Sequence, residues 1–165
     1  MTFSADKDAC ELLDADHIAV KHLFVEYARQ AMLAASPEAE PGSDERVALV
    51  TRICDELTVH AQIEEEIFYP ALQEAVPDTA DQLEEAEAEH AEAKEMIAQL
   101  RTLAVADSAM DDLVAQLNRA IEHHVKEERD ELFPKAKASS LDLVALGAQL
   151  RDRQQALENE SAPAA

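Results

Sequence analysis

Four segments of this chain repeat apolar side chains at alternating spacings of three and four residues, covering about 7–35, 44–76, 79–105 and 109–137. This spacing places the apolar side chains on one face of an α-helix, where they pack against other helices. The four apolar seams are Leu13, His17, Val20, Phe24, Tyr27 and Ala31; Val50, Ile53, Leu57, His60, Glu64, Ile67 and Ala71; Leu83, Ala86, His90, Ala93, Ile97 and Leu100; and Met110, Leu113, Leu117, Ile121, His124 and Glu128. Only two glycines interrupt the 165 residues, which also favours helix almost throughout.

Turn-forming residues separate these segments at 36–43, 77–78, 106–108 and 139–140. Short connections make successive helices antiparallel, so the sequence predicts an all-α, up-down-up-down four-helix bundle. A fifth, shorter helix is expected at 141–158, with an apolar face that either covers the bundle or makes a dimer. We expect a single domain over residues 1–160, with its core at about 10–137, and a flexible tail at 161–165.

The composition excludes some functions. The formal net charge is -22, from 36 acidic and 14 basic residues, so a nucleic-acid partner is not expected. No stretch reaches transmembrane length, and the N-terminus lacks the pattern of a signal peptide. Two cysteines, Cys10 and Cys54, are too few for a disulfide scaffold. A cytoplasmic protein with no membrane partner is therefore expected.

Each of the four seams contains one histidine, and two seams also contain a glutamate. The segments His60-AQIEEEIFYP and His124-VKEERDELFP align without a gap, and each has a glutamate four residues after its histidine, Glu64 and Glu128. Residues four apart share one face of a helix, so each pair can reach the same point. A carboxylate inside a bundle is costly unless it is paired or binds a metal. The repeat is typical of two halves of one metal site.

The spacing from each turn tests whether these polar side chains share one level. His17 and His60 lie about 22 and about 21 residues from the middle of the first connection, and His90 and His124 each lie about 17 from the third. Glu64 and His90 each lie about 13 residues from the second turn. A single seam histidine is usually a core residue, but one on every helix at one level favours a metal site. His22 and His123 fall off the seams and are predicted not to be ligands.

Six protein ligands exceed the four positions of one tetrahedral zinc ion. Four imidazoles and two carboxylates suit two iron ions that share the carboxylates. We expect His17, His60 and Glu64 to serve one iron and His90, His124 and Glu128 to serve the other. A ferritin-like di-iron site is disfavoured, because it needs two Glu-x-x-His motifs and Glu87-x-x-His90 is the only match with a seam histidine.

The chain resembles the hemerythrin-like family, in particular its bacterial His-His-Glu (HHE) cation-binding domains. The resemblance covers about residues 10–137, through Asp16-His17, the His60-x-x-x-Glu64 segment ending in Phe68-Tyr69-Pro70, Glu89-His90, and the His124-x-x-x-Glu128 segment ending in Phe133-Pro134. It implies a four-helix bundle with two non-haem iron ions joined by an oxo or hydroxo bridge. It also implies the metal ligands His17, His60, Glu64, His90, His124 and Glu128.

The sequence departs from the oxygen-carrying members of that family. Those members have a second histidine on the third helix, whereas this chain has Ala86 and Lys94 one turn either side of His90. Their last carboxylate is an aspartate five residues after its histidine, whereas Glu128 follows His124 by four. The comparison with those members implies that one iron would lack an imidazole and that both irons could have an open or water-filled position.

These departures lead to three functional hypotheses. The first is a di-iron protein that binds iron or oxygen-related ligands such as O2, peroxide or NO, for sensing, scavenging or protection rather than bulk O2 transport. The second is a di-iron oxidoreductase that decomposes peroxide or handles nitric oxide, with Tyr69 close enough to bond an oxygen ligand. The third is a helical interaction module that holds structural zinc. The sequence leaves open whether the protein is a monomer or a homodimer.

Overall fold

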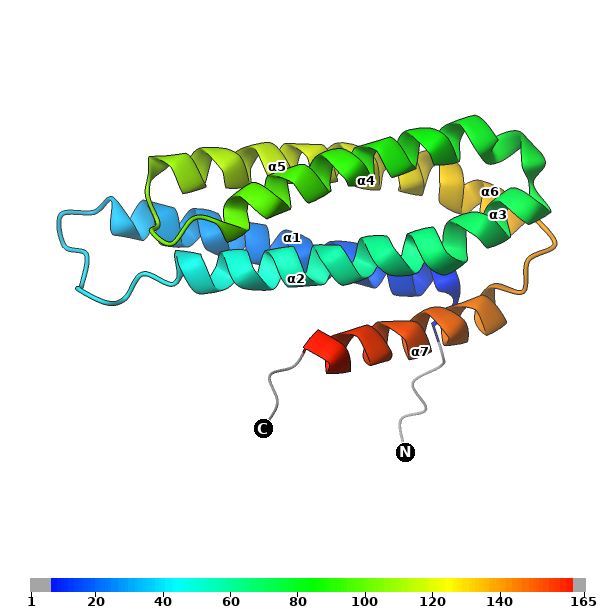
Figure 1. Cartoon of the computed structure of the whole chain (residues 1–165), viewed down its shortest axis with the longest axis horizontal. Coiled ribbons are helices and arrows are strands. Elements are labelled where there is room, and N and C mark those ends of the chain that lie inside the picture. Colours follow the sequence, from blue (N-terminus) through cyan, green and yellow to red (C-terminus); the bar gives the residue numbers. More distant parts are fainter. Residues whose placement is uncertain (1–6, 162–165) are drawn as a thin grey trace.

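A computed structural model describes residues 7–161, and within this range the regular structure is entirely helical. The helices are α1 (Ala9–Ala34), α2 (Arg46–Ile63), η1 (Glu64–Phe68), α3 (Tyr69–Ala75), η2 (Pro77–Thr79), α4 (Ala80–Arg101), α5 (Ser108–Glu127), η3 (Glu128–Leu132), α6 (Phe133–Ala138) and α7 (Leu143–Ser161). Figure 1 shows four long antiparallel runs, formed by α1, by α2 to α3, by α4, and by α5 to α6. The predicted bundle is confirmed.

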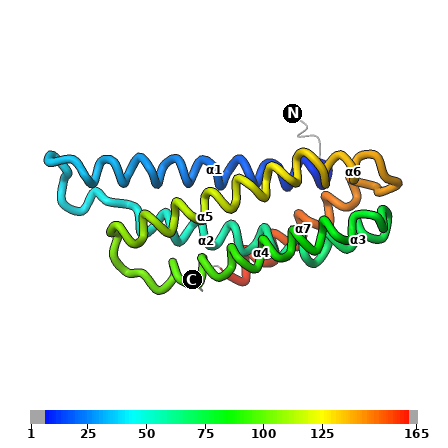
Figure 2. Tube along the Cα trace, turned by 90° about the horizontal axis from the view of Figure 1, so that it is seen from above, coloured from blue at the N-terminus to red at the C-terminus, as the bar shows by residue number. Residues whose placement is uncertain are grey.

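Each long run packs beside two others, and α7 lies outside them. Contacts join α1 to α2, α2 to α4, α4 to α5, and α5 to α1, which is the order of an up-down-up-down bundle. The tube in Figure 2 shows these runs lying lengthwise beside one another. The predicted fifth helix is α7, and it covers α1, α2 and η1. The predicted tail falls almost wholly on residues 162–165, which lie outside the described residues.

Aspartate side chains begin two of the runs. Asp8 precedes α1 and accepts a hydrogen bond from the Glu11 N–H, and Asp107 precedes α5 and accepts from Ala109 and Met110. These bonds satisfy backbone donors that a helix start leaves free. No helix in the described part of the chain is long and apolar enough to cross a lipid bilayer.

The seams had predicted that the second and fourth runs are continuous α-helices. The structure shows that they are not. Each contains one π-helical turn, η1 or η3, which starts at the glutamate of a His-x-x-x-Glu pair. The Tyr69 N–H donates to the Glu64 carbonyl and the Phe133 N–H to the Glu128 carbonyl, both five residues earlier. The next residue is a proline in both runs, Pro70 and Pro134. Proline has no N–H and its ring crowds the carbonyl four residues before it, which accounts for the wider turn.

The π turn at η1 shifts the buried face of the second run by one residue. The seam had predicted Ile67 and Ala71 inside the bundle, and both are only half-buried. Phe68, Tyr69 and Leu72 are buried in their place, each at most 1% exposed. This part of the predicted seam is therefore wrong, because a π turn contains one residue more than the α-helical turn assumed by the 3.6-residue period.

The apolar core forms two separate clusters along the bundle. One cluster includes Leu13, Ile63 and Leu132 together with the buried face of α7, and the other includes Val20, Leu57 and Leu117. On each run the seam histidine falls between residues of the two clusters. The histidines and glutamates therefore form a polar layer with apolar packing on both sides.

A buried arginine ties the helix ends that are remote from the π turns. Arg46, only 8% exposed, donates to both carboxylate oxygens of Asp111 at 2.9 and 3.0 Å and to the Ala106 carbonyl at 3.2 Å. Its other bonds are to Asp44, and the Tyr27 hydroxyl also donates to Asp111 at 2.6 Å. This cluster links α1, the start of α2, the loop after α4 and the start of α5.

Candidate metal centre

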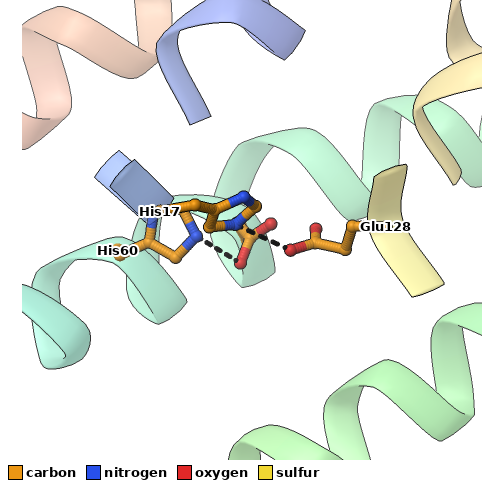
Figure 3. Close-up of side chains that lie close together, drawn as sticks. His17, His60 and Glu128 are labelled. Carbon is orange, nitrogen blue, oxygen red and sulfur yellow. Dashed lines mark ion pairs between the residues drawn. The ribbon is translucent and has the colours of Figure 1, made fainter. Parts of the chain in front are cut away.

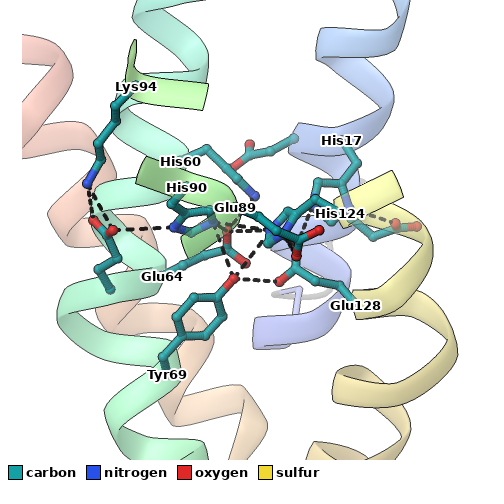
Figure 4. Close-up of polar contacts among 12 residues, drawn as sticks. His17, His60, Glu64, Tyr69, Glu89, His90, Lys94, His124 and Glu128 are labelled. Carbon is teal, nitrogen blue, oxygen red and sulfur yellow. Dashed lines mark hydrogen bonds and ion pairs between the residues drawn. The ribbon is translucent and has the colours of Figure 1, made fainter. Parts of the chain in front are cut away.

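The six seam residues predicted as ligands converge on one buried layer (Figure 4). They come from all four runs of the bundle: His17 (α1), His60 (α2), Glu64 (η1), His90 (α4), His124 (α5) and Glu128 (η3). The histidines are at most 7% exposed, and both glutamates are fully buried. A layer of six ionisable side chains at this depth is costly unless charges or a cation compensate it.

One group of donor atoms joins the first two histidines to both glutamates. His60 Nε2 lies 3.1 Å from Glu64 Oε1, and His17 Nε2 lies 3.1 Å from Glu128 Oε1 (Figure 3). All four side chains offer ligand atoms within 4.8 Å of one another. A cation between them would have two nitrogen and two oxygen donors.

The second group contains Glu64 again, with His90 and His124. His90 Nε2 is 3.3 Å and His124 Nε2 is 3.9 Å from Glu64 Oε1, and the two ring nitrogens are 3.1 Å apart. His124 Nε2 also lies 3.1 Å from Glu128 Oε1. The histidines thus divide into the two pairs expected from the sequence, while each carboxylate lies between the pairs. Glu128 is as close to His17 as to His124.

The donor set fits metal ions. Ligand bonds of about 2.0–2.2 Å at right angles put neighbouring ligand atoms about 3 Å apart, which matches most of these separations. Several buried atoms have no hydrogen-bond partner among the described residues: His17 Nε2, His60 Nε2, both Glu64 oxygens, Glu128 Oε1 and His90 Nδ1. Buried polar atoms are normally satisfied. Five of these six face the centre of the layer, where cations would satisfy them.

Every ring Nδ1, on the side away from the centre, faces a carboxylate. The pairs are His60 with Asp16 at 2.9 Å, His124 with Glu89 at 3.2 Å, His17 with Asp14 at 3.3 Å, and His90 with Glu65 at 3.4 Å. The first three are hydrogen bonds, and the fourth is a close contact without hydrogen-bond geometry. A carboxylate at this nitrogen orients the ring and leaves Nε2 free to bind a metal.

The sequence did not identify these outer carboxylates. Asp16 and Glu89 directly precede His17 and His90, and successive residues of a helix point about 100° apart. Each carboxylate reaches instead the histidine of a neighbouring helix. A residue next to a seam residue lies on the flank of its helix, facing the next helix. That position is the signal that could have indicated their role.

Tyr69 contributes a hydroxyl group to the layer. Its oxygen is 3.3 Å from His90 Nε2, His124 Nε2 and Glu128 Oε2, and its ring stacks on His90 at 5.4 Å. The second hypothesis from the sequence had placed Tyr69 close enough to bond an oxygen ligand, and the structure places its hydroxyl group beside the candidate ligands.

The equivalent residue in the second half is Phe133, which stacks on His17 at 6.0 Å. Tyr69 and Phe133 therefore occupy matching places after η1 and η3, against different histidine pairs. Of these two rings, that of Tyr69 brings a hydroxyl group to its histidine pair and that of Phe133 does not. The two halves of the layer are related in backbone but differ in chemistry.

The charges of the layer shift its pKa values strongly. Burial alone would lower the pKa of His60, but Glu64 and Asp16 outweigh it and raise the value to about 10. Burial opposes ionisation of Glu64, yet the charge of His60 and the nearby polar side chains of the layer hold the pKa of this carboxyl well below its usual range. The carboxylate charges thus attract positive charge into the layer, which either protons or metal ions supply.

A small cavity adjoins the four histidines. Its volume is about 30 Å³, enough for one or two molecules the size of water. Its apolar lining comes from Val20, Leu57, Ala93, Ile97, Ile121 and Val125. The cavity therefore provides space for a small uncharged molecule beside the four histidines.

The remaining histidines and the cysteines lie apart from the layer. His22 is exposed and His123 is 63% exposed, with His123 contacting Glu89 and Glu127. Cys10 and Cys54 are buried free thiols in different core clusters. Burial raises the pKa of both thiols, to about 12 for Cys10, so they are unreactive at neutral pH.

The fold and this layer define a helical-bundle protein with a buried histidine and glutamate site for cations. Residues 8–136 match the family model of the hemerythrin HHE cation-binding domain. The chain therefore belongs to the hemerythrin HHE cation-binding domain family, as its sequence had indicated. No curated protein matches the chain significantly.

A solved structure supports this assignment. The chain is similar to a hemerythrin HHE cation-binding domain-containing protein from Mycobacterium kansasii, with 25% sequence identity and a TM-score of 0.72. The similarity covers 93% of this chain and 89% of the other. It therefore covers a larger part of the chain than the family model does.

Proposed function

We propose that this protein binds two non-haem iron ions and uses them to handle iron or small oxygen-related ligands, in sensing, scavenging or protection. The observation that carries the proposal is the buried layer of four imidazoles and two shared carboxylates, with unsatisfied ligand atoms that face one another. The proposed ligands are His17, His60, Glu64, His90, His124 and Glu128.

Iron is favoured over structural zinc by the number and kind of donors. A structural zinc ion takes four ligands in a closed tetrahedron. The two donor groups together offer six side chains, and Glu64 belongs to both groups. Mixed imidazole and carboxylate donors with bridging oxygens suit iron. When bound, the two iron ions would supply redox chemistry and open positions for small ligands.

The surroundings of the layer favour ligand handling over reversible oxygen carriage. Ala86 and Lys94 stand where an oxygen carrier would have another histidine. Ala86 is buried in the apolar core and offers no donor, and the Lys94 ammonium bonds the Glu65 carboxylate at 2.9 Å. The second group therefore has fewer imidazoles than a carrier requires. The cavity of about 30 Å³ has room for a ligand the size of O2, peroxide or NO.

Elemental analysis of protein loaded with iron without oxygen tests the proposal. We expect about two iron ions per chain, as six shared ligands imply. His60→Ala should lose most of this iron, while His22→Ala, which changes an exposed histidine, should retain it. One zinc ion per chain, or full iron content in His60→Ala, would overturn the proposed centre.

A di-iron oxidoreductase for peroxide or nitric oxide is the second candidate, and Tyr69 is the observation in its favour. Its hydroxyl lies 3.3 Å from three candidate ligand atoms, so it can donate a hydrogen bond or a proton to a small ligand there. Peroxide turnover well above that of free iron would support this function. If the iron-loaded protein shows no turnover, the enzymatic function is rejected and the binding function is retained.

A further inference from the structure

Each carboxylate behind the histidines is itself held by a second side chain. The pairs are Asp14 with Arg129 at 2.6 Å, Asp16 with Gln154 at 3.0 Å, Glu65 with Lys94 at 2.9 Å, and Glu89 with His123 at 3.3 Å. Arg129, Lys94 and His123 are basic and belong to the four-helix bundle. Gln154 differs on both counts, because it is neutral and belongs to α7.

The position of Gln154 is well determined by the packing of α7. Leu150 and Leu157, on the same face of the helix, are buried at 0% and 7% exposure in the core cluster shared with α1. The neighbouring Arg153 bonds Glu66 in the π turn η1 at 2.8 Å. The Gln154 amide donates to both oxygens of Asp16, at 3.1 and 3.0 Å. An amide held in this way limits the orientation of the carboxylate.

We propose that Gln154 is a positioning residue for the metal centre, because its amide fixes Asp16 and Asp16 in turn orients the His60 ring. This inference rests on the proposed metal-binding function. It assigns a role to α7 in the site, although α7 lies beyond residues 8–136, which match the family model. The chain of contacts runs from Gln154 Nε2 through Asp16 Oδ2 to His60 Nδ1, with the last separation at 2.9 Å.

The neutral amide has an electrostatic consequence. A basic partner offsets part of a carboxylate's charge, whereas an amide orients the carboxylate and leaves the charge in place. The contact of Asp16 with His60 is also the shortest of the four histidine–carboxylate contacts. His60 should therefore be the most strongly electron-donating of the four imidazoles, and should favour the ferric state of the ion that it binds.

Gln154→Leu removes the amide but keeps nearly the same length of side chain. Its matched control is Gln155→Leu, which changes an exposed glutamine at the next position of α7. We expect the iron-loaded Gln154→Leu protein to release iron to a chelator about threefold to tenfold faster than Gln155→Leu. Asp16→Asn should accelerate release by about 10- to 100-fold, as is typical when the partner of a ligand histidine is lost.

A third variant separates positioning from packing. Gln154→Lys restores a donor to Asp16 but adds a positive charge. We expect it to release iron at close to the wild-type rate, with a shifted ferric absorption spectrum, because the charge withdraws electron density from His60. Equal release rates and spectra in Gln154→Leu and Gln155→Leu would overturn the inference. So would a lower melting temperature of Gln154→Leu without faster release, because it would assign Gln154 only to the docking of α7.

The same experiment distinguishes failure of this inference from failure of the proposed function. Wild-type protein that takes up no iron would overturn both. Wild-type protein with about two iron ions and a Gln154→Leu variant indistinguishable from its control would overturn only the role of Gln154.

Discussion

At the scale of single residues, the two halves of the site differ most at Tyr69 and Phe133. Both residues occupy the same backbone position, directly after a π turn, and both rings stack on a histidine of the layer. The hydroxyl of Tyr69 is the one atom by which these two rings differ in polarity. Burial, with Glu64 and Glu128, raises the pKa of this hydroxyl well above its ordinary value.

Tyr69→Phe should therefore separate metal binding from chemistry. If the protein turns over peroxide, we expect the variant to retain its iron but to lose at least about tenfold in turnover, because a positioned proton donor is removed. Tyr27→Phe is the matched control, since Tyr27 is the only other tyrosine. It lies toward the end of α1, and its hydroxyl donates to Asp111 of α5. Equal turnover in both variants would contradict a chemical role for Tyr69.

At the scale of elements, the docking of α7 depends on a very close approach to α1. A Cβ atom added at Gly147 would lie 2.6 Å from the Lys7 carbonyl oxygen and 2.9 Å from the Ala9 nitrogen. These are backbone atoms and have little freedom to move aside. Gly147 is thus the residue that lets α7 lie against the start of α1.

Gly147→Ala tests this contact against helix propensity. Propensity alone would favour alanine by about 1 kcal/mol, but the clash should destabilise the protein by about 1–3 kcal/mol. Ala148→Gly, at the next and exposed position, should cost about 1 kcal/mol from propensity. Urea unfolding of both variants measures the two effects. A more stable Gly147→Ala protein would show that α7 has room at this point.

The Arg46 cluster makes the far end of the bundle sensitive to acid. Hydrogen bonds from Arg46 hold the pKa of Asp44 below its ordinary value. A carboxyl with a lowered folded-state pKa stabilises the protein above its unfolded value of about 4, and this contribution is lost as the pH falls through the folded value. The contribution of this pair is therefore present at neutral pH.

Arg46→Met should lower the free energy of unfolding by about 1–3 kcal/mol at pH 7, because several charged hydrogen bonds are lost. The penalty should shrink as the pH falls below about 4, the ordinary pKa of an aspartate, because Asp44 then takes up protons in the unfolded chain before it does so in the folded one. Metal-free protein is needed for this measurement, since acid also releases bound metal. Arg52→Met, on an exposed side chain of the same helix with one ion pair at 3.8 Å, should have little effect at either pH.

At the scale of the whole molecule, the polar layer divides the core into two apolar clusters. Four runs of helix meet at this layer, and their buried charges balance only with protons or cations present. Metal binding and folding are therefore coupled, because the ligands converge only in the folded chain. The formal net charge of -22 adds a general attraction for cations.

Removal of the metal should lower the melting temperature. A ligand at about a thousand times its dissociation constant stabilises the folded state by about 4 kcal/mol, which corresponds to roughly 8–16 °C for a chain of this size. Calorimetry of the iron-loaded and metal-free proteins measures this difference. A melting temperature independent of metal would indicate that the layer contributes to folding without a cation.

The helices and the candidate ligands could be predicted from the amino-acid sequence alone, because both depend on local spacing. A residue and the one four positions later share a helix face whatever surrounds them, so His60 with Glu64 and His124 with Glu128 could be paired without a structure. The lengths of the runs placed the histidines at one level. The bundle and the family follow from these patterns, and the structure and the family comparison confirmed both.

The remaining parts of the site depend on contacts between helices. The partners of the histidines lie on neighbouring helices, and Gln154 lies 138 residues from Asp16, so their contacts depend on how each helix is rotated. The place of Tyr69 depends on the π turn before it, which breaks the period used to read the seam. Such features follow from packing between helices and from the proline ring, and the local pattern of apolar residues does not contain them.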